Sequence, residues 1–385
     1  MRLVIFTTQF PPAIGGVETM MWQLAEHLVS KGVNVTVLAP ELVGSTKFDS
    51  SQTLPIRRYD LGAAETGLEK GRQKINLIRT LRAIAQKSVP DAILCAGWDP
   101  CGYLASIAGV LWLRVPYYVM AYGMELMQLP SSFPARQGKF LLRALAFRRA
   151  RRVFAISQFT QKHLIALGVP AQKISIIPPG IQALTGSALL NGLRNRTGSK
   201  ILLTVARLVP RKGHDTVLNA LPYILSQMPN VVYRIVGTGP ESERLQDLSQ
   251  TLGLGSHVEF CGTVSEDERE RLLQECDLFV FPTRQLPTDF EGFGIAVLEA
   301  MQRGKPVVVT RAGAVPEMVQ HGETGLIVEP DDPKALAAAI LTLLQNPARA
   351  LELGANARTV AYAKYRWDLI AERYLSEMTT ALTLG

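Results

Sequence analysis

Short apolar runs alternate along this chain with longer segments in which apolar residues recur every three or four positions. The short runs are rich in Val, Ile and Leu and predict buried strands, whereas the periodic segments predict amphipathic helices. Residues 17–31, for example, carry Met21, Leu24 and Leu28 on one helical face and end at Gly32. Strands are predicted at residues 2–7, 33–38, 92–95, 116–120, 153–156 and 174–177, and at the starts of segments 201–215 and 231–240.

This alternation of strand and helix predicts an α/β fold with open, mostly parallel sheets. A chain of 385 residues is about twice as long as a typical domain, so two domains are expected. The polar stretch 182–200, with its Asn, Gly, Ser and Thr residues, is the expected linker. Ligands of such sheets bind at the carboxyl ends of the strands, and the candidate residues are sought there.

The net charge of +8 is unevenly distributed. Residues 1–180 hold 21 Lys and Arg against 10 Asp and Glu, or +11, which leaves 20 against 23, or −3, for the rest. A basic N-terminal half suggests an acidic partner there, either an anionic membrane surface or a polyanion. Nucleic acid is not expected as a partner.

The four cysteines, Cys95, Cys101, Cys261 and Cys276, lack the paired spacing of a metal site, and the histidines do not cluster with them. We therefore expect no metal and no cofactor, and a reducing compartment. The first residues do not resemble a signal peptide, and the longest apolar run, residues 104–113, is too short for a bilayer that needs about 20 residues. The expectation is a cytoplasmic protein, soluble or peripheral on the inner face of the cell membrane.

Two glutamates, Glu291 and Glu299, lie eight positions apart in the stretch DFEGFGIAVLEAMQRGKPVVVT, residues 289–310. The apolar spacing predicts a helix from about Gly294, whose free amides can bind phosphate or sugar hydroxyls. These amides belong to Gly292, Phe293, Gly294 and Ile295. Glu291 at the mouth of the helix suits a sugar, and Glu299 inside it can accept two hydrogen bonds from a ribose diol. Alternatively, Glu299 faces solvent and Glu291 caps the helix.

Glycines after two other strands are weaker signals of the same kind. Gly15 and Gly16 follow the first strand and allow their amides to approach an anion, and Gly237 follows the strand in segment 231–240. Neither place has the G-x-G-x-x-G pattern of a dinucleotide site, and a purely structural turn is the alternative.

The motifs EGFG, LEAM, GKPVV, VPEMV and GETGLIV occur in an order that resembles retaining glycosyltransferases of family 4, and the similarity covers nearly the whole chain. The resemblance implies the GT-B fold, two Rossmann-like domains facing a central cleft. Residues 1–182 would form the acceptor domain and residues 183–363 the nucleotide-sugar donor domain. A C-terminal helix, residues 364–385, would cross back to the first domain.

The resemblance also assigns roles to residues. Arg207 and Lys212 would grip the donor diphosphate, and the backbone around Gly262 and Val264 would line the base pocket. Tyr122 stands where the family commonly has a histidine that touches the donor sugar. A tyrosine titrates near pH 10, which makes acid–base use near neutrality doubtful.

Two more positions bear on the resemblance. Glu125 matches an acid often found there, with a surface helix residue as the alternative, and Gln182 replaces the usual aspartate.

The implied activity is retaining transfer of a hexose from GDP-mannose or a UDP-sugar to a hydroxyl of a lipid or saccharide, without a metal. The patterns FPP-x-x-GG and DFEGFGI are also similar to those of phosphatidylinositol mannosyltransferases. Two alternatives are an NAD(P)-dependent oxidoreductase, against which the missing glycine pattern argues, and a non-catalytic sugar-nucleotide binding protein.

Two basic segments suggest how a lipid acceptor would be reached. Residues 70–87 place Ile75, Ile78 and Leu81 at helical spacing among cations, and residues 136–152 combine Phe140 and Leu141 with seven cations. Basic amphipathic helices lie in the plane of an anionic membrane surface. The alternative is that both helices simply cover the sheet.

Overall fold

The computed structural model describes residues 1–60, 67–111, 114–127, 133–182 and 198–383. The chain divides into two compact units: unit 1 comprises Met1–Gly180 and Trp367–Gly385, and unit 2 comprises Ile181–Arg366. The sequence placed these divisions a few residues away, after residues 182 and 363. Most of the expected linker, residues 183–197, lies outside the described residues.

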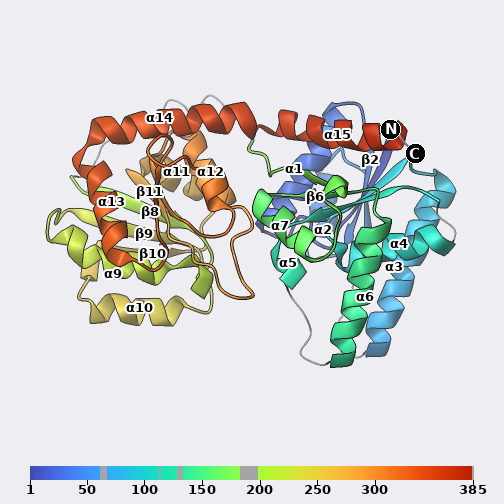
Figure 1. Ribbon diagram of the computed structural model, residues 1–385, viewed down its shortest axis with the longest axis horizontal. Helices are drawn as coiled ribbons and strands as arrows, with labels where there is room; N and C mark the ends of the chain where they lie inside the picture. The colour runs from blue at the N-terminus through green and yellow to red at the C-terminus, as the bar shows by residue number, and fades with distance from the viewer. Residues whose placement is uncertain (61–66, 112–113, 128–132, 183–197, 384–385) are drawn as a thin grey trace. The chain divides into compact units, whose positions relative to one another are not determined.

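Unit 1 contains a seven-stranded parallel sheet in the order β3-β2-β1-β4-β5-β6-β7. Figure 1 shows this sheet with β2 and β6 labelled. Its strands are β1 (Arg2–Phe6), β2 (Asn34–Pro40), β3 (Ile56–Tyr59), β4 (Ala92–Cys95), β5 (Tyr117–Ala121), β6 (Arg152–Ala155) and β7 (Ile174–Ile176). Its helices are α1 (Gly16–Ser30), α2 (Ser45–Ser50), α3 (Gly67–Lys87), α4 (Tyr103–Leu111), α5 (Met124–Met127), α6 (Phe133–Arg149), α7 (Gln158–Ala166) and α15 (Trp367–Thr383).

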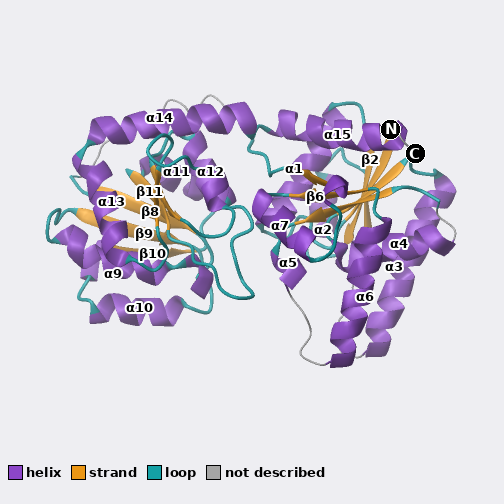
Figure 2. Cartoon of the chain, viewed as in Figure 1, coloured by secondary structure: helices purple, strands orange, loops and turns teal. Residues whose placement is uncertain are grey.

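Unit 2 contains a six-stranded parallel sheet in the order β10-β9-β8-β11-β12-β13. Its strands are β8 (Lys200–Val205), β9 (Val231–Val236), β10 (Val258–Gly262), β11 (Leu278–Phe281), β12 (Val307–Thr310) and β13 (Leu326–Val328). Its helices are α9 (His214–Leu225), α10 (Ser242–Thr251), α11 (Glu266–Glu275), α12 (Ile295–Gln302), α13 (Pro333–Gln345) and α14 (Pro347–Lys364). In both units the sheet is the middle layer between helices (Figure 2).

The strand order reverses once in each sheet, between β1 and β4 in unit 1 and between β8 and β11 in unit 2. The loops after two such strands turn to opposite faces of the sheet, which leaves a crevice at their carboxyl ends. This crevice is where a parallel α/β sheet most often binds its ligand. The residues after β8 and β11 are therefore the first to be considered as a site.

Helix α15 is part of unit 1, as the sequence comparison predicted. The buried ring of Tyr374 packs edge-on against Phe154 of β6, with 5.0 Å between ring centres. The Tyr118 hydroxyl donates to the carbonyl oxygen of Met378 at 2.9 Å. The aromatic residues of this last helix are therefore packing residues, and the core of unit 1 depends on them.

Edge strand β3 and the short helix α2 were not predicted. The sequence of β3, Ile-Arg-Arg-Tyr, has two arginines at its centre and lacks the apolar run of the other strands. Tyr59 of β3 is nevertheless buried, and Arg58 pairs with Asp49 of α2 at 2.7 Å. A strand with one neighbour can keep such charges because part of its surface stays at the rim of the sheet.

The two basic helices, α3 and α6, pack on one face of the unit 1 sheet. In α3, Leu81 is buried and Ile78 is partly buried against the core, so only Ile75 of the three predicted apolar residues is exposed. The predicted apolar face of α3 therefore mainly covers the sheet, because Leu77 and Leu81 fill the core there. In α6, by contrast, Phe140 and Leu141 are 50% and 67% exposed.

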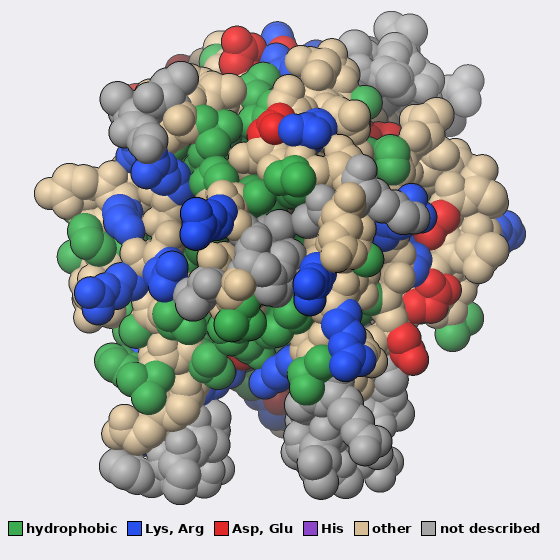
Figure 3. All heavy atoms as spheres, turned by 90° about the vertical axis from the view of Figure 1, so that its right-hand side faces the viewer, with side chains coloured by type: hydrophobic (Ala, Val, Ile, Leu, Met, Phe, Trp, Pro, Cys, Tyr) green, Lys and Arg blue, Asp and Glu red, His purple; other side chains and the backbone are tan. Residues whose placement is uncertain are grey.

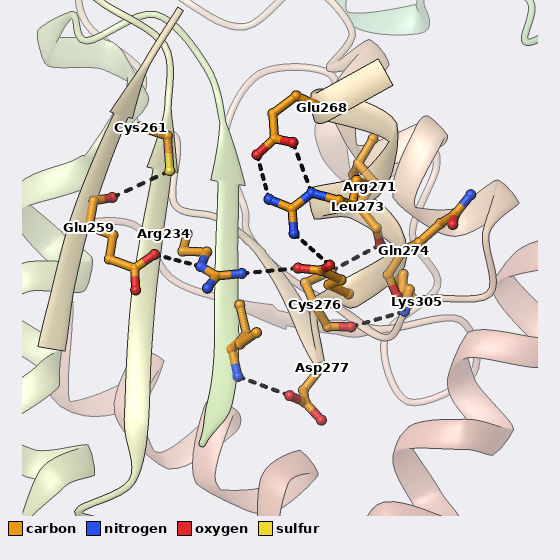
Figure 4. Close-up of polar contacts among 12 residues, drawn as sticks. Arg234, Glu259, Cys261, Glu268, Arg271, Leu273, Gln274, Cys276, Asp277 and Lys305 are labelled. Carbon is orange, nitrogen blue, oxygen red and sulfur yellow. Dashed lines mark hydrogen bonds and ion pairs between the residues drawn. The ribbon is translucent and has the colours of Figure 1, made fainter. Parts of the chain in front are cut away.

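The charges of unit 2 are largely paired on the side of the sheet that α11 covers (Figure 4). Arg234 of β9 pairs with Glu259 at 2.6 Å and with Glu275 at 3.3 Å. Arg271 of α11 pairs with Glu268 and Glu275, both at 2.6 Å. These pairs are at the surface, so each contributes little to stability. Lys305 beside them donates to the carbonyl oxygens of Gln274 and Cys276.

The four cysteines are free, and the described residues contain no group of three or more His, Cys, Asp or Glu placed to hold a metal ion. No helix among the described segments is long and apolar enough to cross a bilayer.

Candidate functional site

The loops that follow β8 and β11 meet at the point where the unit 2 sheet reverses its order. The loop after β8 ends in a short 3-10 turn, Pro210–Lys212, and Gly213, whose φ of 65° favours glycine. A Cβ on Gly213 would overlap the carbonyl oxygen of Pro282, which directly follows β11. The N–H of Arg284 donates to the carbonyl oxygen of Arg211 at 2.8 Å. The two loops are thus locked together, which brings the side chains of one to the other.

Glu291 lies between two cations at this point. Its Oε2 accepts hydrogen bonds from Arg211 Nη1 at 2.7 Å and from Lys212 Nζ. Lys212 Nζ also lies 4.6 Å from the centre of the Phe281 ring, a cation–π contact. Burial would raise the pKa of Glu291, but the charges of Lys212 and Arg211 hold it below its ordinary value. The carboxylate is therefore ionised at neutral pH.

The sequence reasoning missed Arg211. Its side chain is buried, and its Nε lies 2.8 Å from Asp289 Oδ1 in addition to the contact with Glu291. The arginine thus bridges two carboxylates of the loop after β11. The only sequence signal was a second cation next to Lys212, and it does not reveal which of two adjacent cations turns inward.

The backbone of Glu291 is fixed as firmly as its side chain. The N–H of Ala314 donates to the Glu291 carbonyl oxygen at 3.0 Å. Gly313, with a φ of 58°, packs so close that a Cβ would overlap that same oxygen. A glycine is therefore required at position 313 for the carboxylate to keep its place.

Glu299 lies on α12 and is held by a different cation. Its Oε2 accepts from Arg269 Nη1 of α11 at 2.6 Å, and Arg269 also pairs with Glu266. Within the described segments no group donates a hydrogen bond to the other oxygen, Oε1. The side chain is only 18% exposed, so it does not simply face solvent. An anchored carboxylate with one open oxygen can accept a hydrogen bond from a ligand.

Helix α12 begins after Gly294, as predicted, and has no side-chain cap. Gly294 has a φ of 98°, and a Cβ there would press on Met318, Phe281 and Val315. Phe293 is buried and packs edge-on against Tyr365, so its backbone is what this segment offers a ligand. The amides from Gly292 to Ile295 are the candidate donors, because the first N–H groups of a helix lack partners within it.

The loops after β9 and β10 border the loop after β8. A Cβ on Gly237 would overlap the carbonyl oxygen of Ala206, and the Gly237 N–H donates to the Gly262 carbonyl at 2.8 Å. Close packing against Ala206 thus explains why position 237 is a glycine. Gly262 has open space where its side chain would be, and Val264 is partly exposed. Arg207 is exposed beside these loops.

In unit 1, Gly15 and Gly16 stand at the start of α1. The carboxylate of Glu18 lies against Gly15, where a Cβ would overlap it. An acid in the first turn is favoured by the positive end of the helix. An anion that approached these two amides would therefore lie close to the negative charge of Glu18.

Tyr122 and Glu125 follow β5 in the same unit. The Tyr122 hydroxyl lies 3.8 Å from the sulfur atoms of Met21 and Met120, and burial raises its pKa well above the ordinary value. Glu125 Oε1 accepts from the Tyr122 N–H at 2.7 Å, so the acid is not a free surface residue. Burial raises the pKa of Glu125, although backbone N–H groups act in the opposite direction.

His214, the first residue of α9, contacts the backbone of the loop after β8. Its ring is buried, with Nε2 3.3 Å from the Arg207 carbonyl oxygen and Nδ1 3.3 Å from the Tyr233 hydroxyl. Burial lowers the pKa of His214 from 6.5 to about 4. The neutral ring is therefore the form that supports Arg207.

Two protein families match the chain. "Glycosyltransferase Family 4" matches residues 14–183, and "Glycosyl transferases group 1" matches residues 189–360. The chain is 30% identical to a GDP-mannose-dependent alpha-(1-6)-phosphatidylinositol monomannoside mannosyltransferase of Mycobacterium tuberculosis, over 97% of this chain and 96% of the relative. The protein with the same description in Mycolicibacterium smegmatis is 28% identical, over 95% of each chain.

Solved structures also resemble the whole chain, among them the following two. Anabaena HepE in complex with UDP has a TM-score of 0.80 and 22% identity, over 99% of this chain and all of that one. Sucrose-phosphate synthase from Thermosynechococcus elongatus has a TM-score of 0.76 and 22% identity, over the full length of both. These likenesses confirm the predicted GT-B fold class with its two Rossmann-like domains.

The state of His214 predicts how stability depends on pH. Below pH 6.5 the unfolded chain binds a proton on His214 that the folded protein takes up only near pH 4, so this contribution to stability falls as the pH drops from 6.5 towards 4. The full difference is worth roughly 3 kcal/mol. We expect the urea midpoint of the wild type to fall relative to that of His214→Gln between pH 7 and 4.5. The same substitution at the partly exposed His257 is the control, and parallel curves for wild type and His214→Gln would contradict the assignment.

Proposed function

Since the chain belongs to glycosyltransferase family 4, we propose that it transfers a hexose from a nucleotide diphospho-sugar to a hydroxyl of a lipid or saccharide, with retention and without a metal ion. GDP-mannose or a UDP-sugar is the proposed donor. The name of the mycobacterial relative supports GDP-mannose, and the complex of HepE supports UDP.

The observation that carries the proposal is the position of Glu291 between Lys212 and Arg211 at the switch point of the unit 2 sheet. Glu299 lies on the helix that starts just after Glu291. One carboxylate for the transferred sugar and one for the ribose diol fit this arrangement. Arg207 and Lys212 would then lie along the diphosphate.

The charges at this point balance without a ligand, since Arg211 and Lys212 face Glu291 and Asp289. A diphosphate adds negative charge, and we propose that Lys212 Nζ turns from Glu291 towards it. Oε2 of Glu291 then becomes available to accept a hydrogen bond from a sugar hydroxyl. Donor binding would thus prepare the acid that orients the sugar.

Bond breaking between the sugar and the diphosphate leaves more negative charge on the phosphate oxygen. Arg207 and Lys212 would stabilise this charge, which is the role that a metal ion has elsewhere. A preorganised donor of this kind contributes about 2.7–4 kcal/mol to the transition state. Retention would follow from attack on the face that the diphosphate leaves, with a phosphate oxygen taking the proton of the acceptor hydroxyl. Glu291 orients the sugar in this scheme and does not attack it.

Tyr122 would have no acid–base role in this scheme, because burial keeps its hydroxyl protonated at neutral pH. Its hydroxyl contacts two thioether sulfurs, which are weak acceptors. Packing against Met21 and Met120 is the role we propose for it.

We also propose that unit 1 docks on an anionic membrane where a lipid acceptor would lie. The exposed Phe140 and Leu141 of α6, with Ile75 of α3, supply the apolar contacts. The exposed Arg136, Arg79 and Lys74 supply positive charge. Each cation near an anionic surface contributes about 1 kcal/mol, so several hold a protein there reversibly.

Donor binding and turnover test the proposed reaction. GDP-mannose or a UDP-sugar is expected to raise the thermal midpoint, because a ligand of the native state stabilises it. Lys212→Ala and Arg207→Ala are each expected to lower turnover about 100- to 1,000-fold. Excess chelator is expected to leave turnover unchanged.

Lys200→Ala, at the opposite end of β8, is the matched control and should keep wild-type turnover. Arg207 is exposed, so its variant keeps the proposal testable if Lys212→Ala does not fold. A midpoint raised by NAD or NADP alone would favour the oxidoreductase, and tight donor binding without turnover would favour a binding protein.

The two glutamates are expected to differ in their effects. Glu299→Ala should weaken nucleotide affinity about tenfold or more, because a hydrogen bond to a charged group is worth about 1.5–3 kcal/mol. Glu291→Ala and Glu291→Gln should lower the rate at saturating donor while nucleoside diphosphate binds as tightly as before or more tightly, since Lys212 is released.

Calorimetric affinity and single-turnover rates measure the two effects separately. Glu270→Ala, which removes a carboxylate paired with Arg303, is the control. Identical profiles for the two glutamate variants would contradict the division of roles.

Co-sedimentation with vesicles tests the docking. The protein is expected to bind phosphatidylglycerol vesicles at low salt and to be released as salt screens the charges. Phe140→Ser/Leu141→Ser should weaken binding, whereas Leu351→Ser, an equally exposed leucine in α14, should not. If the wild type stays in the supernatant at low salt, a soluble saccharide becomes the better acceptor.

A further inference from the structure

Unit 1 has a hollow of about 480 Å³ at the N-terminal ends of β5 and β6. Its walls come from the later half of α4, the segment before β5, the end of α6, the residue before β6 and the end of α15. The lining residues are Ser106, Gly109, Arg114, Val115, Pro116, Tyr117, Arg149, Arg151 and Leu382. The strands are parallel, so this end of the sheet is the one opposite to their carboxyl ends. The hollow is therefore distinct from the segments that carry Gly15 and Tyr122.

Three arginines border this hollow, and none of its lining residues is an acid. Arg151 donates through Nε to the Ala381 carbonyl oxygen at 2.8 Å. Among the described residues, Arg114, Arg149 and Arg151 form no ion pair. All three side chains are exposed to solvent, and several positive charges around one space attract an anion.

The unpaired state of these arginines is not general in unit 1. Arg2 pairs with Asp91, Arg58 with Asp49 and Arg152 with Glu377. The segment from 101 to 180, which supplies most of the hollow, has ten Lys and Arg but a single acid, Glu125. Glu125 bonds to the N–H of Tyr122, in the segment after the carboxyl end of β5, so it does not neutralise the hollow. Figure 3 views this end of unit 1 and shows Lys and Arg side chains spread among hydrophobic ones.

The hydroxyl groups of the lining are already used. Tyr117 donates to the Ala146 carbonyl oxygen at 2.7 Å, and Ser106 Oγ lies 3.5 Å from the Leu145 carbonyl oxygen. The guanidinium groups are therefore the donors that remain for a ligand. Arginine forks match the oxygens of a phosphate group, and several around one space suit a group with more than one negative charge.

The other walls are apolar, formed by Val115, Pro116 and Leu382. The volume lies in the range of sites for small organic molecules, about 300–1,000 Å³. From the three unpaired arginines and these walls, we propose that the hollow binds a phosphate ester, with the phosphate on Arg114, Arg149 and Arg151 and the organic part against the apolar side. The ester is either a soluble metabolite or the headgroup of a phospholipid. Because Leu382 and Ala381 belong to α15, an occupied site also fastens the end of that helix to unit 1.

Calorimetric titration with inorganic pyrophosphate at low salt tests the site. Pyrophosphate can also occupy the cations near Lys212, so the wild type is expected to show two sites. Arg114→Gln/Arg149→Gln is expected to lower the affinity of the hollow for pyrophosphate about tenfold or more, because charge-assisted hydrogen bonds are lost. Lys212→Ala should remove the other site and keep this one. Circular dichroism checks that each variant is folded.

Lys47→Gln/Lys162→Gln removes the same charge from exposed residues of α2 and α7 that do not line the hollow, and it should keep both sites. Unchanged binding in Arg114→Gln/Arg149→Gln would overturn the proposal, and so would an equal loss in the control pair. Monomeric dihexanoyl phosphatidylglycerol distinguishes the two sources. Competition with pyrophosphate for this site assigns a lipid headgroup, and lack of competition assigns a soluble phosphate ester.

Discussion

The candidate site depends on one buried cluster of charges, in which Arg211 and Lys212 face Glu291 and Asp289. Charges out of water are stable only when they are paired and hydrogen-bonded, and removing one member of a buried pair costs about 3–5 kcal/mol. The cluster therefore fixes the loop after β8 to the loop after β11. Lys212 has two tasks in this arrangement, because it holds Glu291 in place and is also the cation proposed for the diphosphate. Lys212 can therefore turn to the donor only if the negative charge of the diphosphate replaces Glu291 as its partner.

The elements with a clear apolar pattern were predictable from sequence. Strand β4 was predicted at its observed residues, 92–95, and α12 starts after Gly294 because a glycine and an apolar period coincide there. The pairing of Glu299 with Arg269 was not predictable, since the two residues lie on different helices and 30 positions apart in the sequence. The inward turn of Arg211 depends on Asp289, which is far away in sequence. Strand β3 was missed because its position at the edge of the sheet allows arginines that an inner strand would not contain.

The two units differ in how some of their arginines are paired. In unit 2, arginines on the sheet and on α11 have carboxylate partners, as Arg234 and Arg271 show. In unit 1, three arginines border a hollow that no acid lines. The excess of positive charge seen in the composition is thus partly a local feature of one end of the sheet. Composition alone suggested a membrane or a polyanion, and the structure adds a site of small-molecule size.

The place of α15 has a consequence for how the protein is made. Unit 2 is one continuous segment, whereas the core of unit 1 needs Tyr374 against Phe154. Residues 1–180 emerge from the ribosome first. The core of this unit is nevertheless completed only when the segment after residue 366 has emerged. Domains usually fold in the order of synthesis, N-terminal first. Here the later unit can complete its fold while the earlier one still exposes the apolar side of β5 and β6, so during translation unit 1 is the part most in need of a chaperone.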